Sequence, residues 1–202
     1  MSRAPRVGVI ACGALAVHVR AIARRRGWPV DLHPVPALHH NHPERIAPAV
    51  RSTVDALRGR YDRLACAYGD CGTYGALDAA LEGTGVERLP GEHCYDLFAR
   101  DEVHEALAQE PGTYFLTDFL ARTFEHTVVR ELGLDRWPEL RDAYFGSYTR
   151  VLWLAQADTP ANRHAAQRAA ERLGLPLQVR AVGDRALERA LERLVEGSGV
   201  GG

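Results

Sequence analysis

Short apolar runs alternate with longer amphipathic segments along almost the whole chain. Seven runs have the length of buried strands: 6–11, 29–35, 62–68, 86–89, 113–117, 150–156 and 176–182. The segments between and after them have helical length: 13–26, 43–58, 73–83, 95–109, 118–132, 138–145, 160–174 and 184–196. This alternation predicts an α/β protein with a mainly parallel sheet, helices on both faces and about seven β/α units.

Local signals mark the ends of several elements. Three arginines and Gly27 close the first predicted helix, where cations and a left-handed glycine favour a helix C-terminus. Pro43 suits the first turn of the second predicted helix. No change of composition marks a linker, and 202 residues suffice for one full core or at most two small lobes. We therefore expect a single α/β domain over residues 1–196 and a disordered tail at 197–202.

Charge and composition limit the classes of partner that we expect the protein to bind. The formal net charge is −1, so electrostatics favours neither a nucleic acid nor an anionic membrane as a partner. No apolar run approaches the roughly 20 residues of a membrane helix, and the first residues lack a signal-peptide pattern. The sequence contains no lysine, which excludes chemistry that needs a lysine amine from this chain. We expect a cytoplasmic protein with a small-molecule substrate; whether it forms a homo-oligomer is open.

Three of the four cysteines follow directly on strand-like runs. Cys12 comes after the run 7–11, Cys71 after 64–68 and Cys94 after 86–90. In a parallel sheet such positions meet at one edge, where ligands bind. Cys66 lies inside an apolar run and is expected in the core. The sequence therefore predicts a three-thiol site made by Cys12, Cys71 and Cys94.

The segment around Cys71 is rich in glycine and precedes a predicted helix. Free N–H groups at a helix start attract anions, so Gly69, Gly72 and Thr73 are candidates for binding a cofactor or an anionic substrate. The same setting lowers the pKa expected for a cysteine at position 71. A tight turn that packs a small cysteine is the structural alternative.

Histidines and aspartates supply candidate acids, bases and further ligands. The loop 36–43 holds three histidines, of which we select His40 over His39 and His42. His93 precedes Cys94 and is either a ligand or a cation that stabilises the thiolate. Candidate catalytic residues are thus His40, His93 and two aspartates that follow strands, Asp70 and Asp118. Asp118 is equally well explained as a helix N-cap.

Three thiolates predict a zinc ion or an iron–sulfur cluster with one coordination position left open, and the residue types do not decide between these metals. Long spacings between the cysteines favour a catalytic site over a zinc finger. A metal-free enzyme that uses Cys12 and Cys71 as acid and base, as racemases do, is the first alternative. A non-catalytic metal carrier or accessory factor is the second.

Several segments together form a specific pattern: 11–15, 68–73, 93–95, 111–119, 133–140, 144–148 and 154–156. They resemble a prokaryotic family catalogued as domain of unknown function 1638, over about residues 6–190. A Leu-His-Asn step of that family aligns with Leu38, His40 and Asn41, and Tyr74 stands where the family pattern has a small residue. The resemblance implies a role beside corrinoid-dependent methyl transfer in one-carbon metabolism, with a corrinoid protein as partner.

Overall fold

The computed structural model describes residues 5–196. These residues form two compact units, the first made of residues 5–97 and 186–196 and the second of residues 98–185. Each unit has its own parallel sheet with helices packed on it. The two units are described separately below.

The first unit is built on four parallel strands, β1 (Val7–Cys12), β2 (Val30–Val35), β3 (Arg63–Ala67) and β4 (Glu87–Arg88). Their order in the sheet is β2-β1-β3-β4. Every residue of β1 is buried, as expected of a central strand with helices on both faces. In register, Cys12 lies opposite Val35 of β2 and Ala11 lies opposite Ala67 of β3. Three strands therefore end at nearly the same level.

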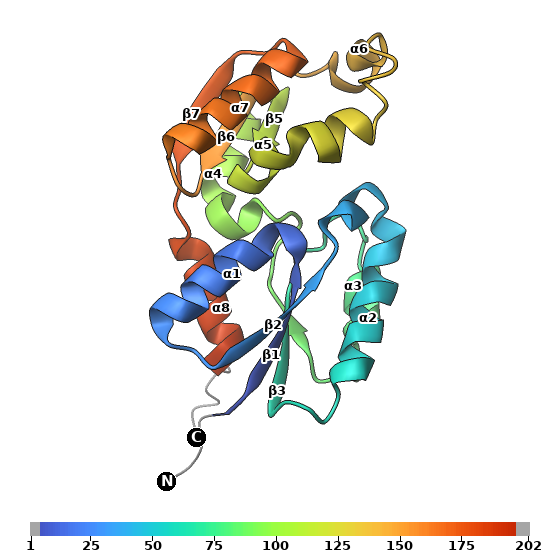
Figure 1. Cartoon of the computed structure of the whole chain (residues 1–202), viewed down its shortest axis with the longest axis vertical. Helices are drawn as coiled ribbons and strands as arrows, with labels where there is room; N and C mark the ends of the chain where they lie inside the picture. The colour runs from blue at the N-terminus through green and yellow to red at the C-terminus, as the bar shows by residue number, and fades with distance from the viewer. Residues whose placement is uncertain (1–4, 197–202) are drawn as a thin grey trace. The chain divides into compact units, whose positions relative to one another are not determined.

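Helices cover both faces of this sheet (Figure 1). On one face α1 (Gly13–Arg26) lies beside α8 (Arg185–Glu196), and Arg25 and Arg26 form ion pairs with glutamates of α8. On the other face lie α2 (Ile46–Leu57) and α3 (Ala76–Leu81). Two short 3₁₀ helices, η1 (Ala37–Asn41) and η2 (Pro43–Arg45), connect β2 to α2. As predicted, Gly27 ends α1 in the left-handed conformation.

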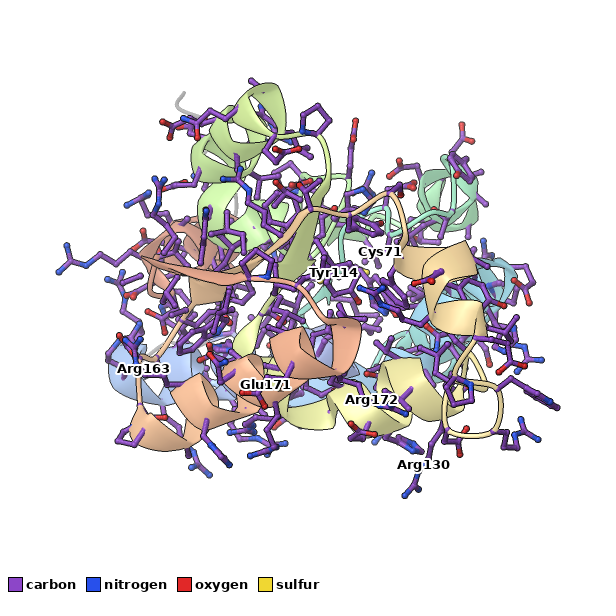
Figure 2. The ribbon with its side chains drawn as sticks, turned by 90° about the horizontal axis from the view of Figure 1, so that it is seen from above. Cys71, Tyr114, Arg130, Arg163, Glu171 and Arg172 are labelled. Carbon is purple, nitrogen blue, oxygen red and sulfur yellow. The ribbon has the colours of Figure 1, made fainter. Side chains whose placement is uncertain are left out.

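The second unit carries three parallel strands in the order β5-β6-β7, namely β5 (Thr113–Leu116), β6 (Arg150–Ala155) and β7 (Leu177–Ala181). Its helices are α4 (Asp96–Gln109, which begins in the first unit), α5 (Asp118–Phe124), the π-helical η3 (Glu125–Arg130), α6 (Leu140–Phe145) and α7 (Pro160–Leu173). Fully buried Trp153 of β6 lies in a core made with α5 and α7. Arg163, Glu171 and Arg172 lie on the outer surface of α7 (Figure 2).

The predicted α/β class and parallel pairing are confirmed, and all seven expected strands are present. They form two parallel sheets, one in each unit. The prediction of a single domain over residues 1–196 stays a prediction. The four-stranded sheet has the two-residue strand β4 at one edge. Thr117, not Asp118, is the N-cap of α5, because its side chain accepts a hydrogen bond from the backbone N–H of Leu120.

The helix predicted over 118–132 is divided into α5 and η3. The predicted tail at 197–202 lies outside the described residues. None of the helices within residues 5–196 combines the length and the apolar character that crossing a bilayer requires.

Candidate functional site

Three strand ends of the first unit carry the predicted cysteines. Cys12 is the last residue of β1 and the residue before α1. Cys71 lies in the loop from β3 to α3, and Cys94 lies in the loop from β4 to α4. Because the strands are parallel, all three loops leave the same edge of the sheet. Cys12 and Cys71 are buried and Cys94 is partly buried, and all are free thiols.

His40, from the 3₁₀ helix η1, provides the point where the three thiols meet. Its Nδ1 lies 3.8 Å from the Cys12 sulfur and 3.0 Å from the carbonyl oxygen of Ala37. Burial alone would lower the pKa of the imidazole, but the side chains of Cys12, Cys71 and Cys94 all interact with the ring and raise that pKa well above its usual range. The loop after β2 thus adds an imidazole to the sulfur cluster.

The cysteines differ in how their surroundings affect ionisation. Burial would raise the pKa of the Cys12 thiol, but the contact with His40 outweighs it and lowers that pKa. For Cys94 burial dominates, and the pKa of the thiol is raised despite the nearby His40. Burial in the centre of β3 raises the pKa of Cys66 to about 12. Cys12 is therefore more easily ionised than Cys94, and Cys66 is a core thiol.

Tyr68 also belongs to this cluster, although the sequence alone did not single it out. Its ring is fully buried and stacks on His40, with centroids 5.8 Å apart and planes 15° from parallel. Burial, together with the negative charge of the Cys12 thiolate, raises the pKa of its hydroxyl. An aromatic residue at a strand end is typical of a hydrophobic core. The one sequence signal that could have identified Tyr68 as a site residue is its position just before Gly69.

The loop that carries Cys71 has an unusual backbone. Cys71 and Tyr74 both adopt the left-handed conformation, with φ of +54° and +50°. This conformation costs an L-residue with a Cβ roughly 1–2 kcal/mol. The Asp70 carboxylate offsets part of the cost by accepting hydrogen bonds from the Thr73 hydroxyl and from the backbone N–H groups of Tyr74 and Gly75. The same bonds lower the pKa of Asp70 against the effect of its partial burial.

The Cys71 loop is joined to the Cys94 loop through the backbone. Asp70 N donates to Gly91 O over 2.9 Å, and Cys71 N donates to Glu92 O over 2.6 Å. Gly69 permits this approach, because a Cβ there would lie 3.3 Å from the backbone of residues 91 and 93. These contacts explain structurally why glycine stands at position 69. The hydrogen bond to Asp70 likewise gives Thr73 a structural role. The predicted role of Gly69, Gly72 and Thr73 in cofactor binding stays a prediction.

The remaining histidines of the two loops are placed differently. His93 is exposed, its ring lies 4.9 Å from that of Tyr95, and its backbone N–H donates to Asp96. His42 is exposed, with Nδ1 3.6 Å from a carboxylate oxygen of Glu44. His39 has a buried Nδ1 without a hydrogen-bond partner. Of these loop histidines, His40 is the one that interacts with the three thiols.

Asp118 lies in the second unit, and its contacts are those of a structural residue. Its carboxylate accepts hydrogen bonds from Trp153 Nε1 at 2.9 Å, from the backbone N–H groups of Gln156 and Ala157, and from Asn162 Nδ2 at 3.0 Å. The acceptor positions of the buried carboxylate are thus occupied. It joins α5, β6 and α7, and the catalytic role predicted for it stays a prediction.

Two observations bear on metal binding at the thiol cluster. Within residues 5–196, no three side chains of His, Cys, Asp or Glu are arranged to hold a metal ion as they stand. Two polar atoms of the cluster, His40 Nε2 and the Tyr68 hydroxyl, are nevertheless buried without a hydrogen-bond partner. Buried polar atoms are rarely left so, and each calls for an explanation.

Replacing Asp118 by alanine should lower the free energy of unfolding by at least about 3 kcal/mol, because it leaves several buried donors without an acceptor. Asp158→Ala is the matched control: Asp158 pairs with Arg163 at 2.5 Å on the surface and should contribute less than about 1 kcal/mol. Urea denaturation measures both. A stable Asp118→Ala protein would contradict the structural role.

Tyr74 has a strained backbone and a side chain that is 96% exposed, so little packing opposes its replacement. Tyr74→Gly should therefore be more stable than Tyr74→Ala by about 1 kcal/mol, although glycine normally lowers stability relative to alanine. Chemical denaturation of the two variants tests this. The opposite order would show that the left-handed backbone at position 74 carries no cost.

Comparison with known proteins places the chain in a family. A family model described as "Protein of unknown function (DUF1638)" matches residues 35–191, which is well over half of the chain. No curated protein matches the sequence, and no solved structure matches it either. The match begins at the end of β2 and includes His40, Tyr68, Cys71 and Cys94, with Cys12 before it. The chain belongs to the DUF1638 family.

Proposed function

We propose that the chain is a metal-binding enzyme whose centre is held by Cys12, Cys71 and Cys94 at the strand ends of the first unit. The observation that carries the proposal is the interaction of three thiols, from the ends of three strands and the loops that follow them, with one partly buried histidine. Cys66, in contrast, is fully buried in the middle of β3, and burial accounts for its environment. Three sulfur donors in one place are instead the ligands of a soft metal centre.

The residues fit a zinc ion or an iron–sulfur cluster in their chemistry. Thiolates are the preferred ligands of both, and the unpartnered Nε2 of His40 is a further nitrogen donor in the same place. Because the side chains are not arranged as a finished site, binding requires the three thiols to lose their protons and turn toward one point. Bound zinc would supply a Lewis acid that activates a thiol or a water.

The protein itself contributes placement and charge. Cys12 is fixed by the end of a central strand, and Asp70 holds the turn that presents Cys71. His40 favours the thiolate form of Cys12. The exposed His93 does not meet the cluster, so His40 is the imidazole that this site offers for ligation or proton transfer. A link to corrinoid-dependent methyl transfer belongs to the same proposal and rests on the family resemblance alone.

Metal analysis of protein expressed and purified without oxygen tests the proposal. The wild type should contain about one zinc ion per chain, or iron and sulfide with a brown colour. Cys12→Ala, Cys71→Ala and Cys94→Ala should each lower the metal content severely. Cys66→Ala is the matched control and should keep the metal, because that thiol lies in the core of β3. A wild type without metal, or equal loss in all four variants, would contradict the proposal.

A metal-free enzyme is the second candidate, and one contact favours it. The Cys12 sulfur and His40 Nδ1 are 3.8 Å apart without any metal, which suits a thiolate–imidazolium pair. With Cys71 on the opposite side of a carbon acid, such a pair would remove and return a proton. Solvent deuterium should then enter a candidate amino acid in the presence of chelated protein. Exchange that stops on chelation would assign the activity to the metal.

A further inference from the structure

Strand β7 forms one edge of the sheet in the second unit, and among the described residues β6 is its one partner strand. The last four residues of β7 are exposed, and they include Val179, whose exposed fraction is 37%. The edge of a sheet presents backbone N–H and C=O groups that can pair with a further strand. β7 is therefore a position at which another strand can join this sheet.

The register of the ladder with β6 shows which backbone groups of β7 face outward. Just after β7, Val182 N donates a hydrogen bond to Ala155 O of β6. In a parallel ladder every second residue bonds to the same neighbouring strand, so residues 178 and 180 also face β6. The backbone groups that face away from the sheet consequently belong to Leu177, Val179 and Ala181.

These outward-facing residues are spaced so that a second copy of β7 fits them. When two copies run antiparallel about Val179, this residue lies opposite itself, and Leu177 lies opposite Ala181. Each residue in these pairs directs both its N–H and its C=O at the other copy, as the hydrogen-bonded pairs of an antiparallel ladder require. The arrangement has two-fold symmetry, so it closes at a dimer and uses the β7 edge of both copies.

The side chains of β7 suit the same register. The three outward-facing residues share one face of the strand, and it is the face of fully buried Trp153, which stands opposite Val179 in β6. A second copy would cover the exposed side of Val179 and extend this apolar surface. On the other face Gln178 lies opposite Arg180 of the second copy, so like charges do not meet directly. Arg180 is also paired with Glu105 of its own chain at 3.6 Å.

The other three edges of the two sheets are less suited to such pairing. β2 contains Pro34, which has no N–H to donate, and β4 is only two residues long. β5 is mostly buried. β7 has five residues and contains neither proline nor glycine. We propose that the protein forms a two-fold dimer in which β7 pairs antiparallel with β7 of a second copy, which joins the two three-stranded sheets into one.

Sedimentation velocity of the full chain at increasing concentration tests the dimer. The wild type should change from monomer to dimer below about 100 μM. Val179→Pro should weaken the association by roughly 10–100-fold, because it removes the central pair of hydrogen bonds and leaves the N–H groups that bind β6 intact. Val179→Lys should weaken it as well, because two positive charges would meet at the two-fold axis. Val17→Lys is the matched control: it changes another exposed valine, on α1, and should leave the dimer unchanged.

Hydrogen exchange measured by NMR tests whether β7 is the surface involved. The amide protons of residues 177, 179 and 181 should exchange more slowly in concentrated than in dilute protein, whereas those of residues 178 and 180, which already bond to β6, should change less. A wild type that stays monomeric up to about 100 μM overturns the inference. So does a dimer that both variants at position 179 leave intact, or one in which the three outward amides exchange equally fast at both concentrations. If circular dichroism shows that the proline variant does not fold, the lysine variant and the exchange rates of the wild type decide.

Discussion

Parallel pairing of β1 with both of its neighbours is the constraint on which the candidate site depends. Cys12 stands opposite Val35 at the end of the ladder with β2, while Ala11 stands opposite Ala67. The chain therefore leaves all three strands at one level, and the loops that bear His40 and Cys71 begin beside Cys12. Residues separated by tens of positions in the sequence become neighbours through this register alone. A shift by one residue would turn Cys12 to the other face of the sheet.

Buried polar atoms at this edge of the sheet differ from those of the second unit in their hydrogen bonding. In the second unit, the Asp118 carboxylate accepts hydrogen bonds at both of its oxygens and so joins three elements. At the sulfur cluster, by contrast, His40 Nε2 and the Tyr68 hydroxyl are left without partners, and Cys71 holds a strained backbone. Buried polar groups with a structural role normally have their hydrogen-bond partners, whereas backbone strain and unpartnered groups are concentrated at ligand-binding and active sites. This contrast supports a functional reading of the first site and a structural one of the second.

The sequence predicts those features of the fold that depend on local patterns, namely the individual strands and helices. Apolar runs of strand length and Gly27 after three arginines define elements that agree closely with the structure. The sequence does not predict the division into two sheets, because no change of composition marks a boundary between them. The place of Cys12, Cys71 and Cys94 at one sheet edge follows from strand ends. The sequence also favours His40 over His39 and His42, although it does not predict the 3₁₀ helix that places His40. Tyr68 is not singled out, because it resembles any core aromatic.

The backbone hydrogen bonds between the segments at 70–71 and 91–92 have a consequence for how the site responds to its contents. Two of the three sulfur-bearing segments are fastened to each other, while the third belongs to a strand that is itself held on both sides. A ligand that shifts the Cys94 loop would therefore also act on the Cys71 loop through these bonds, whereas Cys12 is held separately by its strand pairings.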